Sequence, residues 1–167
     1  MPSLDIRPAT PSDLELLLQL IHELVLAEQF PFEVTVTATD LKQSLFGPRP
    51  AAEAVIAEYE SEVVGFAVFY ETFATTTGRR GLHLDDLFIR PSHQGRGLGR
   101  QLLSYVARVA SSRHCARFEW WSLRTNTRAI EFYKGLGGRP MEELLVFRTQ
   151  GAAISALGGS CSPSAQP

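Results

Sequence analysis

The stretch HQGRGLGRQLL, residues 93–103, places glycine at three alternate positions directly before a helical pattern of leucines. The apolar run GLHLDDLFIRP comes just before it and predicts a strand. The start of a helix leaves backbone N–H groups without a helical partner, and glycines let an anion approach them because no Cβ intervenes. Two arginines, Arg96 and Arg100, lie on the same turn. The pattern therefore favours a phosphate-binding loop over a merely flexible turn.

The spacing of this loop excludes two common phosphate-binding motifs. A Walker loop requires Lys and then Ser or Thr after its last glycine, and this chain has Arg100 and Gln101 there. A dinucleotide-binding fingerprint requires its third glycine where Arg100 stands. The loop belongs to neither class.

Hydrophobic periodicity and turn signals predict an α/β domain around this loop. We expect strands at 4–10, 54–59, 63–73, 81–91, 117–123 and near 143–149. The capping residues Thr10 and Thr37 predict the starts of two helices, of which the first runs to about residue 28. Further helices are expected from the glycine turn to 112 and at 127–136. The second and third strands form an antiparallel hairpin. We assign residues 1–150 to one domain and expect the tail 151–167, rich in Gly, Ser and Ala, to be mostly disordered.

Composition narrows the class of protein. A hydrophobic content of 44% and a charged content of 20% are typical of a globular chain. The net charge of −2 offers no bulk attraction, so we expect no nucleic acid or membrane partner. The start of the chain shows no targeting pattern, which predicts a cytoplasmic protein. Cys115 and Cys161 have no spacing that suggests a pair or a metal site, so we expect free thiols and no metal.

The strand before the glycine loop changes its alternation midway. In a regular strand, Leu82 and Leu84 point to one face, and Leu87 and Ile89 point to the opposite face, because the first pair is even-numbered and the second odd-numbered. A β-bulge at Asp85 and Asp86 would return both pairs to one face, and bulges often lie beside active sites. The alternative is that Leu82 belongs to the preceding turn and no bulge exists.

Gln94, Gly97 and Gly99 match the Gln-x-x-Gly-x-Gly motif of the GNAT superfamily of N-acetyltransferases, which the chain resembles from IRPAT through LDDLFIRPSHQGRGLG to NTRAIEFYKGLGG. The segment IHEL and the spacing from Asn126 to Tyr133 are similar to the spermidine/spermine and thialysine acetyltransferase branch. The resemblance implies an α/β fold with a mixed, mostly antiparallel sheet and helices on both faces. It also implies acetyl-coenzyme A as cosubstrate and no metal.

The resemblance further implies which residues hold the cosubstrate. The backbone of residues 87–89 would pair with the pantetheine arm, the glycine turn would hold the pyrophosphate, and Asn126 would lie beside the cosubstrate. Asn126 could equally be the N-cap of the helix that follows it. The implied cofactor-binding residues are Leu87, Phe88, Ile89, Gln94, Gly95, Arg96, Gly97, Leu98, Gly99, Arg100 and Asn126.

Acetylation of an amine sets two chemical demands. An alkylammonium with a pKa of about 10 must lose a proton before it can attack, and a carboxylate can accept that proton directly or through water. By resemblance, Asp85 occupies this catalytic position and Asp86 is structural; the alternative is that both belong to a solvated strand end. The departing thiolate needs a proton, and Tyr133 matches the family's tyrosine general acid. A core aromatic is the alternative for Tyr133.

The predicted substrate is the primary amine of a small molecule. The implied substrate-binding residues are Glu28, Asp85, Glu119, Trp120 and Trp121. The chain departs from its polyamine-acetylating relatives at Phe30, Phe32 and Arg124, which favours a lysine analogue or amino-acid-like amine over spermine. The alternative is that both phenylalanines pack their own loop and Arg124 points to solvent.

Three further expectations concern assembly and competing functions. Analogy with the branch predicts a homodimer, with EELLVF, residues 142–147, as an apolar edge. A catalytically silent acyl-CoA-binding sensor would keep the glycine loop but would not need Tyr133 and Asp85. A protein that uses the fold only for interactions would not need the glycine loop.

Overall fold

The computed structural model describes residues 4–159, and the chain divides into two compact units with a boundary after Asn126. The first unit holds the sheet and three α-helices, in the chain order β1 (Asp5–Pro8), α1 (Leu14–Glu28), α2 (Ala38–Phe46), β2 (Glu53–Tyr59), β3 (Glu62–Ala74), β4 (Arg79–Ile89), α3 (Leu98–Ser112) and β5 (Arg117–Trp120). Short 3-10 turns at Pro11–Asp13 and Pro91–His93 precede α1 and the glycine loop. These bounds confirm the strands and helices predicted for this part of the chain, except that β5 ends earlier.

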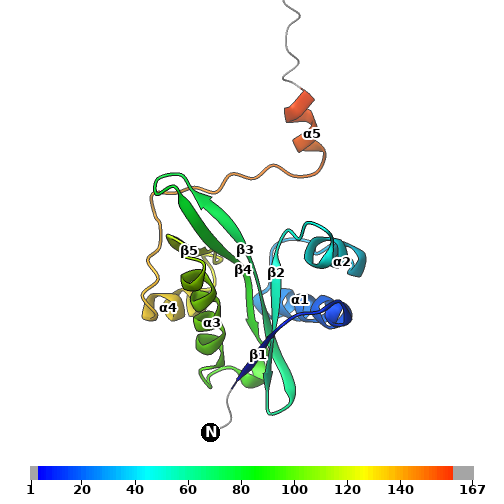
Figure 1. Ribbon diagram of the computed structural model, residues 1–167, viewed down its shortest axis with the longest axis vertical. Coiled ribbons are helices and arrows are strands. Elements are labelled where there is room, and N and C mark those ends of the chain that lie inside the picture. Colours follow the sequence, from blue (N-terminus) through cyan, green and yellow to red (C-terminus); the bar gives the residue numbers. More distant parts are fainter. Residues whose placement is uncertain (1–3, 160–167) are drawn as a thin grey trace, which may run out of the picture. The chain divides into compact units, whose positions relative to one another are not determined.

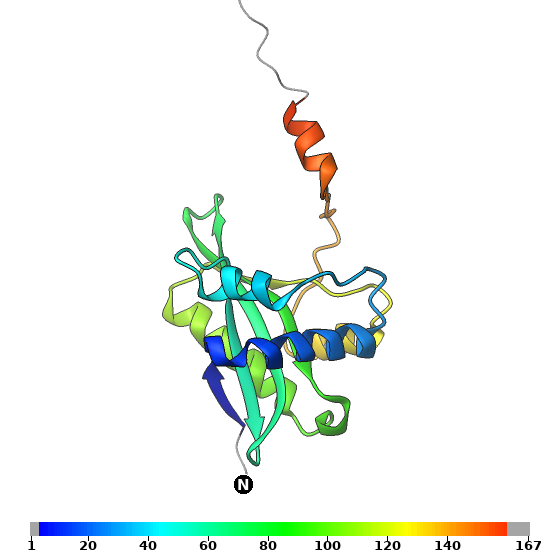
Figure 2. The same cartoon turned by 90° about the vertical axis from the view of Figure 1, so that its right-hand side faces the viewer.

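The sheet has five strands in the order β1-β2-β3-β4-β5. The pairs from β1 to β4 are antiparallel, and β5 runs parallel to β4. Figures 1 and 2 show α1 and α2 on one face of the strands and α3 on the other. This mixed sheet with helices on both faces confirms the predicted α/β class.

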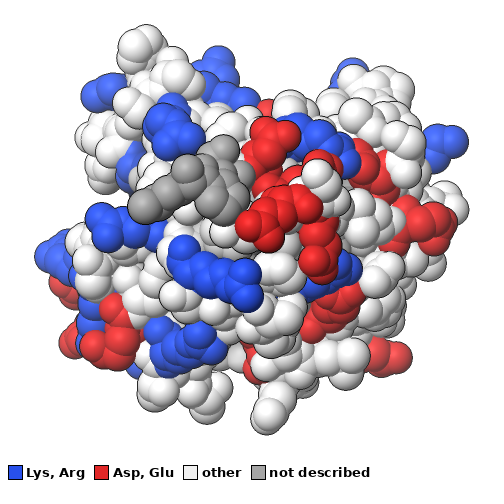
Figure 3. Space-filling model, turned by 90° about the horizontal axis from the view of Figure 1, so that it is seen from below, with Lys and Arg blue, Asp and Glu red and all other residues white. Residues whose placement is uncertain are grey.

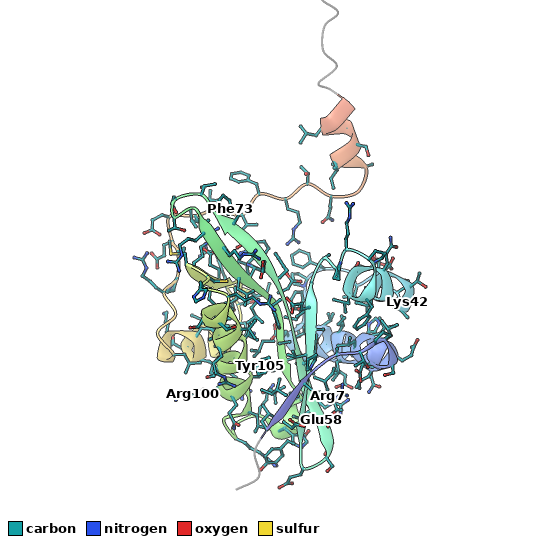
Figure 4. The ribbon with its side chains drawn as sticks, viewed as in Figure 1. Arg7, Lys42, Glu58, Phe73, Arg100 and Tyr105 are labelled. Carbon is teal, nitrogen blue, oxygen red and sulfur yellow. The ribbon has the colours of Figure 1, made fainter. Side chains whose placement is uncertain are left out.

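Capping boxes formed by Thr10 with Asp13 and by Thr37 with Asp40 fix the starts of the helices that cover one face. At the entry to α1, Asp13 accepts a hydrogen bond from the Thr10 N–H at 2.8 Å and two from Arg7 at 2.9 Å. Arg7 also donates to Glu58 on the neighbouring strand (Figure 4). These donors, the Arg7 guanidinium first, hold the pKa of Asp13 well below its usual range despite burial. Ion pair and cap together anchor α1 to the sheet.

Each face of the sheet has its own apolar core. On the α1 side, Leu17 and Leu20 pack with Phe66 and Phe88, whose rings meet edge to face at 6.2 Å. On the α3 side, the buried residues include Leu82, Leu84, Leu98, Leu102, Val106 and Ala110. Burying such side chains contributes about 1.5–3 kcal/mol each relative to leaving them exposed. The two cores thus pack helices against both faces of β3 and β4.

The predicted bulge in β4 is confirmed. Leu84 pairs with Phe69 and Asp86 pairs with the adjacent Val68, so Asp85 is the extra residue. Leu87 pairs with Ala67, two positions from Phe69 on the same face. The extra residue shifts the alternation by one position, so all four apolar side chains lie on the α3 face: Leu82, Leu84, Leu87 and Ile89. It also turns Asp86 to the α1 face.

The second unit contains α4 (Thr127–Gly135) and α5 (Ala152–Gly159). The helix predicted at 127–136 is confirmed, but the strand predicted near 143–149 is wrong, because residues 144–150 are neither helix nor strand. An apolar run becomes a strand only where another strand supplies a hydrogen-bonding partner, and this run has no ladder partner among residues 4–159.

The end of the chain also differs from the prediction. Where disorder was expected from residue 151, the structure describes the exposed helix α5, whose three alanines and one leucine favour helix. The rest of the tail, with Cys161, lies outside the described residues; Cys115 is a free thiol, as predicted. Among residues 4–159, no helix has the length and apolar content needed to cross a membrane.

Candidate active site

The glycine loop joins the end of β4 to the start of α3. Gly95 and Gly97 have φ values of +80° and +77°, in the left-handed region that side chains rarely adopt. A Cβ at either position would meet nothing within 4 Å, so backbone conformation and not crowding requires glycine there. The Gln94 side chain donates to the Ile89 carbonyl at 2.8 Å and ties the loop to the strand. The predicted loop residues therefore form one open turn.

The start of α3 presents backbone donors. Gly97 is the residue before the helix, and its carbonyl accepts the first helical hydrogen bond, from the Gln101 N–H at 3.1 Å. The N–H groups of the first helical turn, from Leu98 to Arg100, have no partner inside the helix. Arg96 and Arg100 are exposed, and Figure 4 labels Arg100 on α3. The geometry suits an anionic group.

Charge on the surrounding surface is mixed. Figure 3 views the end of the molecule at which α3 begins and shows Lys, Arg, Asp and Glu side chains on the same face. Attraction for an anion on this face is therefore local to the glycine loop and does not come from a single-sign surface.

The bulge opens one edge of β4. Strands β4 and β5 pair only from Gly81 with Arg117 to Leu84 with Trp120. From the bulge onward, Leu87, Phe88 and Ile89 pair with β3 alone. Their N–H and C=O groups on the other edge have no strand partner in the described part of the chain. An extended ligand with amide groups could pair there.

Three carboxyl groups meet where the bulge turns Asp86 toward α1. Burial raises the pKa of Asp86 from its ordinary value of 3.8 to about 7, and the negative charges of Asp85 and Glu28 add to the shift. Asp85 itself is exposed at the bulge. A carboxyl with a pKa near neutrality, beside an open strand edge, is suited to exchange protons at physiological pH.

Glu28 is the last residue of α1, and Gln29 ends the helix in the left-handed conformation. Burial raises the pKa of Glu28, while a hydrogen bond from the Asn126 side chain acts in the opposite direction. This hydrogen bond connects the end of α1 to the loop after β5. Asn126, predicted beside the cosubstrate and alternatively as a helix cap, therefore contacts a predicted substrate-binding residue.

Aromatic side chains lie on the same face as Asp86. His83 on β4 is only 6% exposed and pairs with Tyr70 on β3, with their ring centroids 5.0 Å apart. The rings of His83 and Trp121 meet edge to face, with their centroids 4.9 Å apart. Burial lowers the pKa of His83, and the nearby Asp85 and Glu119 carboxylates act in the opposite direction. The imidazole is thus neutral at physiological pH.

The other predicted substrate residues lie in two places. Glu119 lies opposite His83 in the β4–β5 pairing and forms an ion pair with Arg117 at 2.8 Å. Trp120 pairs with Leu84 and therefore lies on the opposite, α3 face. The structure brings Glu28, Asp85, Glu119 and Trp121 to the α1 side and leaves Trp120 outside this group.

Phe30 and Phe32 follow α1 and contact each other edge to face at 6.3 Å. Arg124 is exposed. The contact between the two rings agrees with the alternative that the phenylalanines pack their own loop, and the role of Arg124 remains a prediction. Tyr133 lies in α4 of the second unit, half-buried and 5.2 Å from the Phe132 ring. Its role as a general acid remains a prediction.

Sequence reasoning missed three residues of this site. Asp86 was assigned a structural role, and Tyr70 and His83 were given none. The bulge itself was the available signal, because the change of parity places Asp86 and His83 on one face. Within residues 4–159, no group of three or more His, Cys, Asp or Glu side chains is arranged to hold a metal ion.

Comparison with known proteins gives consistent matches. The acetyltransferase (GNAT) family matches residues 18–137. Thialysine N-epsilon-acetyltransferase of Mus musculus is 32% identical over 95% of this chain and 99% of its own, and that of Caenorhabditis elegans is 33% identical over 93% and 97%. Among solved structures, an integron cassette protein from the mobile metagenome of V. cholerae is 26% identical, covers 93% of this chain and 98% of its own, and superposes with a TM-score of 0.75.

Proposed function

The chain belongs to the GNAT acetyltransferase family and is an acyltransferase, and we propose that it transfers acetyl from acetyl-coenzyme A to the primary amine of a small lysine-like molecule. The observation that carries this proposal is the position of Asp86. This partly buried carboxyl is near two further carboxylates, Asp85 and Glu28, and its pKa is raised to about 7. The residues predicted to hold the cosubstrate and the substrate flank it on the two sides of the bulge.

The chain's own groups fit the proposed cosubstrate. The N–H groups at the start of α3, with Arg96 and Arg100, would bind the pyrophosphate. The free edge at residues 87–89 would pair with the amides of the pantetheine arm. When bound, acetyl-coenzyme A supplies an acetyl thioester whose carbonyl carbon an amine can attack.

Asp86 is the better candidate for the base. Proton transfer from an alkylammonium of pKa about 10 to an ordinary carboxylate is uphill by about 8 kcal/mol, and to a carboxylate of pKa about 7 by about 4 kcal/mol. Asp85 and Glu28 would attract the ammonium ion to this position. In the proposal, Asp86 accepts the proton directly or through one water, and Tyr133 donates a proton to the departing thiolate.

The substrate class rests on two observations. The relatives that match over nearly the whole chain carry the name of thialysine, a lysine analogue. The exposed Arg124 is two residues before Asn126, whose side chain hydrogen-bonds Glu28, and it would repel a long polycation while attracting a substrate carboxylate. We therefore keep the preference for a lysine analogue over spermine.

The experiment is acetyl-coenzyme A turnover with thialysine, spermidine and spermine, detected as free thiol and by the mass of the acetylated amine. We expect turnover with thialysine, and a spermine kcat/KM about tenfold or more above thialysine would contradict the substrate preference. Thermal stabilisation by acetyl-coenzyme A without turnover of any amine would instead favour a silent acyl-CoA sensor.

A homodimer and a cytoplasmic location are further parts of the proposal. Leu144, Leu145, Val146 and Phe147 are exposed, Phe147 by 89%, in a stretch without regular secondary structure. Such a run of apolar side chains is typical of an interface, and pairing with a second copy would supply the missing strand partner. Sedimentation at micromolar concentration should show a dimer, and only an 18.5 kDa species would count against it.

A further inference from the structure

The parallel ladder between β4 and β5 ends at a large side chain that the proton transfer described above does not use. Its last pair is Leu84 with Trp120, and beyond this pair the two strands no longer bond to each other. Trp120 is also the last residue of β5. The indole thus belongs to the point where the sheet opens between the two strands.

Trp120 lies on the α3 face of the sheet, like its partner Leu84. The ring of Phe118, two residues earlier on the same face, has its centroid 5.0 Å from that of the Trp120 ring. Leu84 is only 2% exposed, whereas Trp120 is half-buried. Phe118 and Leu84 therefore support the indole, and part of it stays accessible.

The proposed cosubstrate reaches this point with its acyl end. In the proposed function, the start of α3 binds the pyrophosphate, and the pantetheine arm runs along the free edge from Ile89 back to Leu87. The strand from Ile89 to Asp86 spans about 10 Å. The thioester that follows the arm therefore lies at the bulge, and the pair of Leu84 with Trp120 is the next one along the strands.

The two faces of this opening have different roles in the transfer. Asp86 and Glu28 lie on the α1 face, so the amine approaches the thioester carbon from there. The acyl chain cannot occupy the path of the amine, and it is therefore directed to the α3 face, where the ring of Trp120 lies. An acetyl group ends at a methyl, whereas a propionyl or butyryl group carries one or two further methylene groups toward the indole.

We propose that Trp120 closes the α3 side of this opening and limits the acyl donor to acetyl-coenzyme A. This inference rests on the proposed function for the course of the cosubstrate, and it adds a residue that selects the donor, on the face of the sheet opposite to the acceptor. A ring held in place by Phe118 rejects a longer chain by overlap. One methylene in an apolar site changes kcat/KM by about tenfold or more.

The first test compares kcat/KM for acetyl-, propionyl- and butyryl-coenzyme A, with thialysine as the acceptor. We expect the wild-type protein to prefer acetyl over butyryl by about 100-fold or more. Trp120→Leu should lower this preference by about tenfold or more, because the smaller side chain leaves room for the added methylene groups. Trp121→Leu is the matched control: this adjacent indole packs against His83 on the α1 face, so any change in activity applies equally to all three donors.

The second test measures affinity without turnover, by calorimetry with free, acetyl- and butyryl-coenzyme A and no amine. Free coenzyme A has no acyl group, so Trp120→Leu should leave its affinity unchanged. The same variant should bind butyryl-coenzyme A more tightly, relative to free coenzyme A, by about fivefold or more. Trp120→Phe, which keeps a smaller aromatic ring, should show a smaller gain and provides the measurement if the leucine variant does not fold.

The two tests separate the role of Trp120 from the proposed function. Equal use of acetyl- and butyryl-coenzyme A by the wild-type protein, or a donor preference that the Trp120 variants leave unchanged, would overturn the role of Trp120 while the proposed function stands. Absence of acetylated amine from the wild-type protein, with donor affinities that still depend on Trp120, would overturn the proposed transfer and leave the selection by acyl length in place.

Discussion

Replacing Asp85 by Asn separates the two adjacent carboxylates of the bulge. If Asp86 is the base, this change removes a negative charge that helps to raise the pKa of Asp86. Adjacent carboxylates are about 6–7 Å apart, and with the exposed Asp85 screened by water (an effective dielectric constant of about 40–80) they interact by about 0.6–1.4 kcal/mol. The pKa of Asp86 should therefore fall by about 0.5–1 unit.

The assay is the pH profile of kcat/KM, which reports the ionisations of the free enzyme. We expect the rate of the wild-type protein to rise with pH through about 7 as Asp86 loses its proton, and the Asp85→Asn profile to be displaced to lower pH with activity retained. Glu28→Gln should displace the profile in the same direction. Deprotonation of the amine contributes equally in all variants, and Glu60→Gln, in the exposed β2–β3 turn, is the control.

One result would refute this reasoning. If Asp85 were the base, Asp85→Asn would lower kcat/KM by about 100-fold or more at every pH. Loss of that size, with Asp86→Asn still active and a pH profile that Glu28→Gln leaves unchanged, would return the catalytic role to Asp85.

Three other predictions test separate parts of the structure. Gly97→Val forces a β-branched side chain into a left-handed backbone conformation and should weaken acetyl-coenzyme A binding by about tenfold or more in a folded protein; wild-type affinity by calorimetry would contradict the loop assignment. Tyr133→Phe should lower turnover by about 10- to 1,000-fold with little change in stability, and unaltered turnover with chemistry rate-limiting would make this residue a core aromatic. Asp86 has a folded-state pKa raised from 3.8 to about 7, so the native state binds more protons than the unfolded state between these pH values. The free energy of unfolding should therefore fall by up to about 4 kcal/mol as the pH rises through this window. Urea unfolding of Asp86→Asn at about pH 4 and pH 8 should lack this loss, and an equal pH dependence in both proteins would disprove the raised pKa.

Local patterns in the sequence were enough to predict most of the first unit. Capping residues at Thr10 and Thr37 marked the starts of the first helices, and the change of parity between Leu84 and Leu87 marked the bulge. These features depend on residues that are close in the chain, where backbone geometry follows from side-chain type.

Features that depend on tertiary contacts could not be predicted in this way. The raised pKa of Asp86 requires burial in the folded chain and the charges of Asp85 and of Glu28, which is 58 positions away in the chain. The contact of His83 with Trp121 requires the parallel pairing of β4 with β5. The apolar pattern at 143–149 was real, but a pattern does not show whether a partner strand is present.

The central claim is that Asp86 serves acetyl transfer to a small lysine-like amine. The most direct measurement is the single-turnover rate of acetyl transfer from acetyl-coenzyme A to thialysine, in the wild-type protein and in Asp86→Asn, with the acetylated product identified by mass. We predict acetylated thialysine in the wild-type reaction and a rate lower by about 100-fold or more in the variant, with acetyl-coenzyme A affinity unchanged. An equal rate in both proteins, or no acetylated amine from the wild-type protein, would contradict this account.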